Sequence, residues 1–160
     1  GESIDERLCA ETRAMVRPIG RRAIRILWQC SDLAQITPAW LAFNIITPVP
    51  VAMAAGAQIA YRIQWRLVSL KWLTEIVEWD PPNQFVDVQL QGPYELWHHR
   101  PSFFPERGGT RMVDVVRYRL PFGSLGKLAH RFKVRYDLNA IFDYRAMVLS
   151  DIFKTPEARP

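Results

Sequence analysis

Histidine is the side chain that most readily moves protons near neutral pH, and two of the three histidines in this chain, His98 and His99, are adjacent. They lie in residues 96–104, a segment that its apolar pattern predicts to be a β-strand. Neighbouring side chains of a strand point to opposite faces, so this pair cannot form a simple two-histidine metal site. Neither His130 nor the two cysteines, Cys9 and Cys30, obviously completes one. We therefore predict no metal site.

Motifs for other kinds of catalysis are absent from the sequence. It contains no Gly-rich phosphate loop and no dinucleotide fingerprint, and the Gly108-Gly109 pair lies at an expected hairpin turn without a following helix. A serine nucleophile within a G-x-S-x-G elbow is also missing. We expect a protein without a nucleotide or any other cofactor.

Length and composition indicate a single globular domain. The 160 residues leave little room for a second core, and 49% hydrophobic against 23% charged residues can bury a sizeable one. No signal sequence is recognisable, and the longest apolar run, near residues 48–57, is far too short to span a membrane. We expect a soluble cytoplasmic protein, a monomer or a homodimer, in which both cysteines are free thiols.

The net charge of +5 includes two local basic clusters. They form either solvated helix faces or a surface for nucleic acid or an anionic membrane. No aromatic-basic motif of the single-strand binding type and no zinc-finger spacing supports a nucleic-acid partner, so we expect none. The clusters are Arg17, Arg21, Arg22 and Arg25, and Lys127, Arg131, Lys133 and Arg135.

The expected elements are a short N-terminal part, a run of strands and a long terminal helix. Residues 1–12 are predicted to be an arm, residues 13–154 a single domain and residues 155–160 a tail. A strand at 13–17 precedes two short helices, and from Trp40 the apolar period changes to two, which is typical of strands. Tight turns join these strands, so they should pair antiparallel. The expected helices are 21–29, 32–36 and 124–153, and the later strands are 41–46, 57–65, 70–79, 85–91, 96–104 and 110–120.

The terminal helix carries a broad apolar stripe that it can bury only against a sheet. We therefore predict an α+β fold in which a curved antiparallel sheet of about seven strands wraps around this helix. A cavity can form between a bent sheet and a helix that crosses it. Such a cavity would suit an apolar small molecule.

Short motifs spread over residues 33–153 resemble one protein family, the START-related helix-grip superfamily, called SRPBCC, in its bacterial polyketide cyclase/dehydrase-like branch. Singly the motifs are weak, but their common order over most of the chain is fairly specific. They are residues 36–41 (ITPAWL), Trp72-x-Thr74-x-Ile76, residues 79–82 (WDPP), Phe85-Val86-Asp87-x-Gln89, residues 92–94 (GPY), Trp97-x-His99, Gly108-Gly109-Thr110 with Asp114, residues 121–123 (PFG) and residues 141–145 (IFDYR).

The resemblance implies a helix-grip fold with a hydrophobic cavity for lipids, polyketides or similar ligands, and catalysis in only some members. Fold alone therefore does not carry a function to this chain. The sequence also departs from the family pattern. Leu67 and Ser69 stand where Gly and Pro often make a turn, and Pro101 stands where a second histidine is common.

Alternation places Ile59 and Tyr61 on the apolar, interior face of their strand. The family pattern extends this face to Trp72, Thr74, Phe85, Asp87, Gln89, Trp97, His99, Phe103, Asp114 and Tyr118. Of these, the expected ligand contacts are Tyr61, Trp72, Thr74, Gln89, Trp97, Phe103 and Tyr118, together with Phe142 from the terminal helix. Strand 85–91 leaves an alternative open. Its other face holds Val86, Val88 and Leu90, and a shift of one residue would turn Asp87 and Gln89 outward.

In the family-guided register Asp87, His99 and Asp114 share one interior face, where a histidine beside a carboxylate can act as a general acid or base. The alternative is a core histidine satisfied by hydrogen bonds, with aspartates that hold backbone or arginine partners.

These interpretations lead to a ranked set of functions. We expect the binding of an apolar lipid, aromatic or polyketide-like molecule. The alternative is a polyketide-type cyclase or dehydratase that uses the His/Asp group, and an interaction protein that uses the basic faces ranks last. Residues 48–56 and 121–123 are predicted to gate the cavity.

Overall fold

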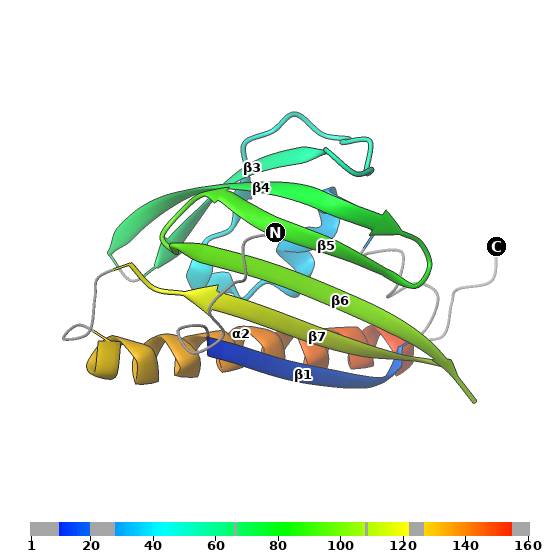
Figure 1. Cartoon of the computed structure of the whole chain (residues 1–160). Helices are drawn as coiled ribbons and strands as arrows, with labels where there is room; N and C mark the ends of the chain where they lie inside the picture. The colour runs from blue at the N-terminus through cyan, green and yellow to red at the C-terminus, as the bar shows by residue number, and fades with distance from the viewer. Residues whose placement is uncertain (1–9, 20–27, 66, 108, 122–126, 155–160) are drawn as a thin grey trace, which may run out of the picture.

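The computed structural model describes residues 10–19, 28–65, 67–107, 109–121 and 127–154. Within these residues seven strands form one sheet in the order β1-β7-β6-β5-β4-β3-β2, and every neighbouring pair is antiparallel. Figure 1 shows β1 beside β7, at the edge that lies along the long helix. The strands are β1 (Ala10–Ile19), β2 (Asn44–Ile45), β3 (Gln58–Trp65), β4 (Val68–Asp80), β5 (Gln84–Gln91), β6 (Leu96–Glu106) and β7 (Gly109–Arg119).

Short turns and two bulges give the sheet its shape. The turn between β4 and β5 is closed by the backbone N–H of Asn83, which donates to the carbonyl of Asp80 at 2.8 Å. The β4–β5 register shifts twice, leaving Val77 and Leu90 without a pairing partner on the other strand. A bulge bends its strand and increases the local twist, so these two positions help the sheet to curve.

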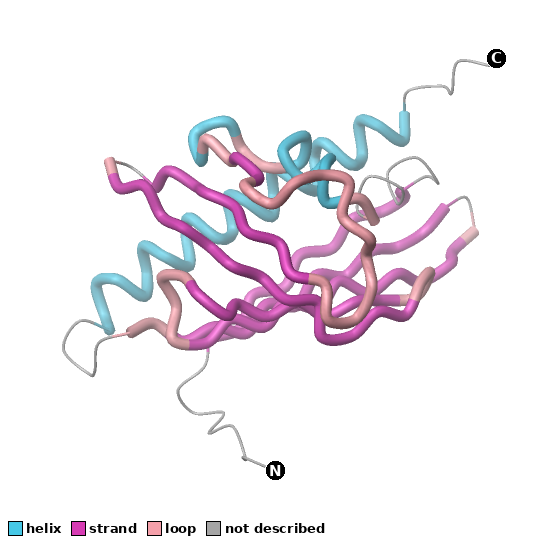
Figure 2. Tube along the Cα trace, turned by 90° about the horizontal axis from the view of Figure 1, so that it is seen from above, coloured by secondary structure: helices cyan, strands magenta, loops and turns pink. Residues whose placement is uncertain are grey.

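Helix α2 (Lys127–Lys154) runs obliquely across one side of the sheet, as Figures 1 and 2 show. Two 3-10 helices, η2 (Cys30–Ile36) and η3 (Ala39–Leu41), lie on this same side, and η2 contacts α2. Apolar side chains from the sheet and the helices form two buried clusters between them. One contains Ile36, Ile76, Phe85, Phe103, Met112 and Leu149, and the other contains Val116, Tyr118, Val134, Leu138 and Phe142.

The predicted α+β architecture is confirmed, with differences at the ends of elements. Strand β1 begins at Ala10, so residues 10–12 belong to the sheet and not to the predicted arm. The strand predicted at 41–46 is reduced to β2, because η3 occupies residues 39–41 and Ala42 adopts a left-handed conformation (φ 42°). The helix predicted at 32–36 is a 3-10 helix that begins at Cys30.

Some of the predicted features lie outside the residues that the structure describes. Most of the helix predicted at 21–29 and the start of the terminal helix, residues 124–126, lie outside the described residues. Cys9 and the tail at 155–160 also lie outside them. Cys30 is buried and forms no disulfide with a described residue.

Candidate functional site

A cavity of about 410 Å³ lies between the sheet and α2. Most of its wall is aromatic or aliphatic, contributed by β3, β4, β6, η2 and α2. Its ionisable members are few among the described residues: Cys30, Tyr61, Asp87, Tyr94, His99, Asp137 and Arg145. This size is within the usual range for small-molecule sites, and such sites combine an apolar wall with a few polar groups.

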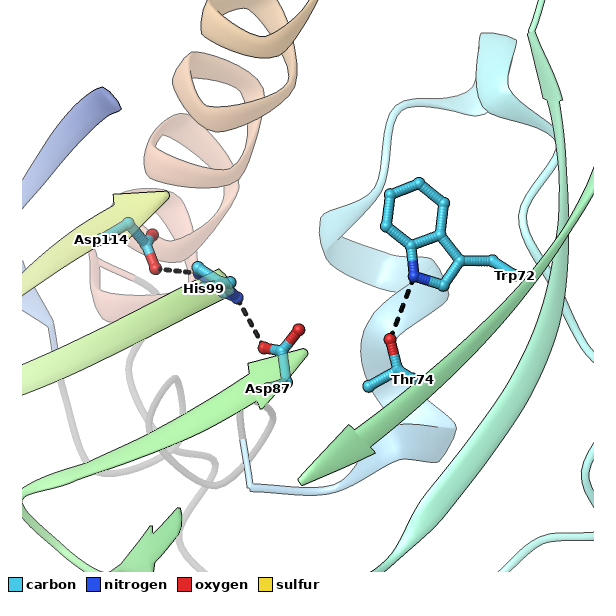
Figure 3. A network of polar contacts seen from close by, with 5 residues as sticks. All are labelled: Trp72, Thr74, Asp87, His99 and Asp114. Carbon is cyan, nitrogen blue, oxygen red and sulfur yellow. Dashed lines mark hydrogen bonds and ion pairs between the residues drawn. The ribbon is translucent and has the colours of Figure 1, made fainter. Parts of the chain in front are cut away.

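Aromatic rings cover one part of the wall. Tyr61 of β3 lies opposite Trp72 of β4, and their rings stack with centroids 5.8 Å apart. Trp97 meets Trp72 edge-on at 5.1 Å, and Tyr94 contacts both tryptophans. The indole N–H of Trp72 donates to Oγ1 of Thr74 at 3.1 Å (Figure 3). These contacts hold the rings as rigid, flat surfaces against which another ring could pack.

The polar centre of the site is His99, which lies between two aspartates from the neighbouring strands (Figure 3). Its Nδ1 is 2.7 Å from Oδ1 of Asp87, and its Nε2 is 2.8 Å from Oδ1 of Asp114. Asp87 stands directly opposite His99 in the β5–β6 register, whereas Asp114 stands opposite Pro101 and reaches His99 diagonally. His99 is 8% exposed and Asp114 only 2%.

The electrostatics of this group set the charge of the imidazole. Burial lowers the pKa of His99, but the charges and hydrogen bonds of Asp87 and Asp114 outweigh it and raise this pKa to about 9. At neutral pH the ring therefore carries both protons and donates one to each carboxylate. An imidazolium with both nitrogens occupied cannot take up another proton. Of the two carboxylates that contact His99, only Asp87 borders the cavity, so Asp87 is the member of this group that could act as a base there.

The structure places the predicted ligand contacts in two groups. Tyr61, Trp72, Thr74, Trp97 and Phe142 border the cavity. Gln89, Phe103 and Tyr118 do not: Phe103 and Tyr118 belong to the buried clusters, and the Gln89 amide holds the backbone of Tyr94 through bonds of 2.7 and 3.3 Å.

The register of β5 is the family-guided one. Phe85 and Asp87 face the cavity, and Leu90, from the opposite face, is 46% exposed. Val86 does not border the cavity, but it is also buried, with an exposed fraction of 4%. Hydrophobicity alone favoured the other register, in which Val86, Val88 and Leu90 are buried. A hydrophobic pattern does not show that a buried aspartate is compensated by a histidine on the next strand.

Several cavity residues were missed by the sequence reasoning, among them Tyr94 and Arg145. Tyr94 lies between strands, where no periodicity indicates which way a side chain points. Arg145 lies three residues after Phe142 on α2, and this helical spacing could have placed it on the cavity face. Of the predicted gates, Met53 and Pro121 border the cavity, while Phe122 and Gly123 lie outside the described residues.

Solved structures with the same architecture cover nearly the whole chain. The aromatase/cyclase ZhuI from Streptomyces sp. R1128 superposes with a TM-score of 0.62 over 89% of this chain and 92% of its own, at 14% identity. Ara h 8.0201 superposes with a TM-score of 0.61 over 89% and 97%, at 13% identity. This chain has the helix-grip fold.

A further match extends over nearly all of the chain but only part of the other protein. The di-domain ARO/CYC BexL, from the BE-7585A biosynthetic pathway, superposes with a TM-score of 0.69 over 98% of this chain and 52% of its own, at 18% identity. No protein-family model and no curated protein sequence matches this chain. At these identities the likeness establishes the fold and leaves the function to be argued from the site.

Two further observations concern the described residues alone. None of their helices is long and apolar enough to cross a membrane. They also contain no group of three or more His, Cys, Asp or Glu side chains arranged to hold a metal ion.

Proposed function

We propose that this protein binds an apolar, ring-containing small molecule, of the lipid, aromatic or polyketide-like kind, in the cavity between the sheet and α2. The observation that carries the proposal is the cavity of about 410 Å³ with its wall of packed aromatic rings. Each 100 Å² of apolar ligand surface removed from water contributes about 2.5 kcal/mol before the costs of association. The aromatase/cyclases that share the fold support a ring-containing ligand.

Native mass spectrometry followed by organic extraction tests this proposal. We expect a defined apolar compound in near-stoichiometric amount on the purified protein. An empty protein that also fails to bind N-phenyl-1-naphthylamine, a neutral fluorescent probe, would contradict it.

A matched pair of variants on β3 locates the binding. Ile63 borders the cavity, whereas Arg62 is exposed on the other face of the same strand. Ile63→Trp should occlude part of the cavity and weaken probe binding, and Arg62→Trp should leave it unchanged. Equal binding by the two variants would mean that the probe binds elsewhere.

The second candidate is a cyclase or dehydratase, and the Asp87–His99–Asp114 group is the observation that favours it. Asp87 would remove a proton from a carbon next to a ligand carbonyl. His99 would act as the positioning residue, because its cationic ring fixes Oδ1 of Asp87 and offsets the carboxylate charge. Asp114 in turn contacts the other ring nitrogen, Nε2.

Deuterium exchange distinguishes catalysis from binding. The compound recovered by extraction would be incubated in D₂O with the wild type, with Asp87→Asn and with Asp143→Asn, a control at an exposed position of α2. An enzyme should exchange or dehydrate the compound, and only Asp87→Asn should abolish this while still binding it. Unchanged compound with the wild-type protein would leave binding as the function.

A further inference from the structure

Arg145 is a cation in the wall of a mostly apolar cavity. It lies on the face of α2 that also carries Leu138 and Phe142 into the wall. Its guanidinium carbon lies over the ring of Phe142, 5.1 Å from the ring centre. The opposite wall of the cavity is formed by sheet residues, including Trp72 and Trp97.

Among the described residues, this guanidinium has no hydrogen-bond or ion-pair partner. Its Nε is buried and has no hydrogen-bond partner, and no described carboxylate forms an ion pair with Arg145. Arginine stays protonated in proteins, so the group cannot relieve its burial by losing the charge. A buried donor without an acceptor destabilises the protein unless something else supplies the acceptor.

One oxygen of each acidic group in the cavity contacts another residue. Oδ1 of Asp87 contacts His99, and Oδ2 of Asp137 accepts a hydrogen bond from the indole of Trp65 at 3.0 Å. Arg145 and Asp87 are both close enough to Tyr61 for their charges to act on its pKa, in opposite directions, but no hydrogen bond joins them. The cation therefore faces space that a ligand can occupy.

We propose that Arg145 binds an acidic oxygen of the ligand, which makes the ligand an apolar ring-containing molecule with a carboxylate or a comparably acidic group. This inference rests on the proposed binding function and deepens it. A guanidinium can hold an oxyanion through two parallel N–H groups, so it would fix the orientation as well as add affinity. The apolar body of the ligand would then pack against the tryptophans of the opposite wall.

Two fluorescent probes that differ in one group test this inference on the full chain. 8-Anilinonaphthalene-1-sulfonate carries an acidic group, and N-phenyl-1-naphthylamine is the same ring system without it. The wild type should bind the sulfonate more tightly than the neutral probe. Arg145→Met, which keeps an apolar stem of similar length, should weaken sulfonate binding roughly 10- to 100-fold, the usual effect of one lost charge-assisted hydrogen bond. Its affinity for the neutral probe should stay the same.

Two more variants separate this effect from net charge and from misfolding. Arg135→Met removes one positive charge from an exposed position of the same helix and should leave both affinities unchanged. Arg145→Lys keeps the charge and should retain part of the sulfonate preference. If Arg145→Met does not fold, Arg145→Lys takes its place in the comparison of the two probes.

The outcomes distinguish this inference from the function on which it rests. If the wild type binds both probes equally, or if Arg145→Met weakens both alike, the cavity binds apolar molecules but Arg145 does not select an acidic group. If the wild type binds neither probe, the proposed binding function fails and the inference fails with it.

Discussion

Raising the pH should remove the proton that lets His99 donate to Asp87 and Asp114 at once, and the fold should lose stability as a result. In the folded protein the pKa of His99 is raised from 6.5 to about 9. Between these values the folded state holds one proton more than the unfolded chain, so stability falls as the pH rises. The contribution is fully present below pH 6.5 and is lost as the pH passes about 9.

The size of this effect follows from the same two values. At about 1.4 kcal/mol per pH unit, the difference between 6.5 and about 9 corresponds to about 3 kcal/mol of unfolding free energy. His99 is 8% exposed and Asp114 2%, so solvent screens this interaction little. Such a loss is a large fraction of the stability of an ordinary domain.

Two measurements check the prediction. Urea unfolding at pH values from about 6 to about 10 gives the stability curve. Nuclear magnetic resonance follows the His99 ring directly, with its signals assigned by their absence from His99→Gln. Asp114→Asn supplies the comparison: it removes one of the two carboxylates but leaves the ring buried, so the pKa of His99 should fall and the stability curve should flatten.

His98 titrates in a different pH range from His99, because burial and the nearby charges of Arg117 and Arg100 lower the pKa of His98 below 6.5. A wild-type His99 that titrates at or below 6.5 would refute the assignment of an imidazolium held by two carboxylates. A stability curve that stays flat through the window would refute it as well.

Two substitutions away from His99 test the packing around the site. Leu149 is fully buried, and Leu149→Ala should lower the unfolding free energy by about 2–5 kcal/mol in urea unfolding; a loss below about 1 kcal/mol would mean that the cluster beside η2 is loosely packed. A Cβ at Gly92 would overlap the Gln89 amide, so Gly92→Ala should break the bonds that hold Tyr94, at a cost of about 1–3 kcal/mol. It should also weaken binding of N-phenyl-1-naphthylamine, whereas an unchanged affinity would show that the position of Tyr94 does not matter for the cavity.

Much of the fold could be predicted because local patterns specify local elements. The period-two alternation of Ile59, Tyr61 and Ile63 marks an interior face, and all three side chains border the cavity. The Pro and Gly turns between strands similarly predicted the antiparallel order from β4 to β7. The short β2 was predicted too long, because alternation alone does not reveal the left-handed conformation at Ala42.

The face of the sheet on which a side chain lies was less predictable wherever a strand contains a bulge. Val77 and Leu90 are unpaired, so alternation cannot simply be continued from one strand to the next across β4 and β5. Gln89 was expected to contact a ligand, but its amide turns to the Tyr94 backbone instead. Phe103 and Tyr118 were expected in the wall, but they are buried without bordering the cavity, and this difference depends on where α2 covers the sheet.

The sequence by itself determined the kinds of element, their order and the apolar character of the interior, because these depend on residues close together in the chain. It also supplied His99, Asp87 and Asp114 as candidate acid–base residues, but not their geometry. Asp87 is 12 residues and Asp114 15 residues away from His99, and both contacts depend on the registers of two strand pairs. The same holds for Arg145, which meets the cavity only because α2 packs across the sheet. Register and packing are set by long-range contacts, and these exist only once the chain has folded.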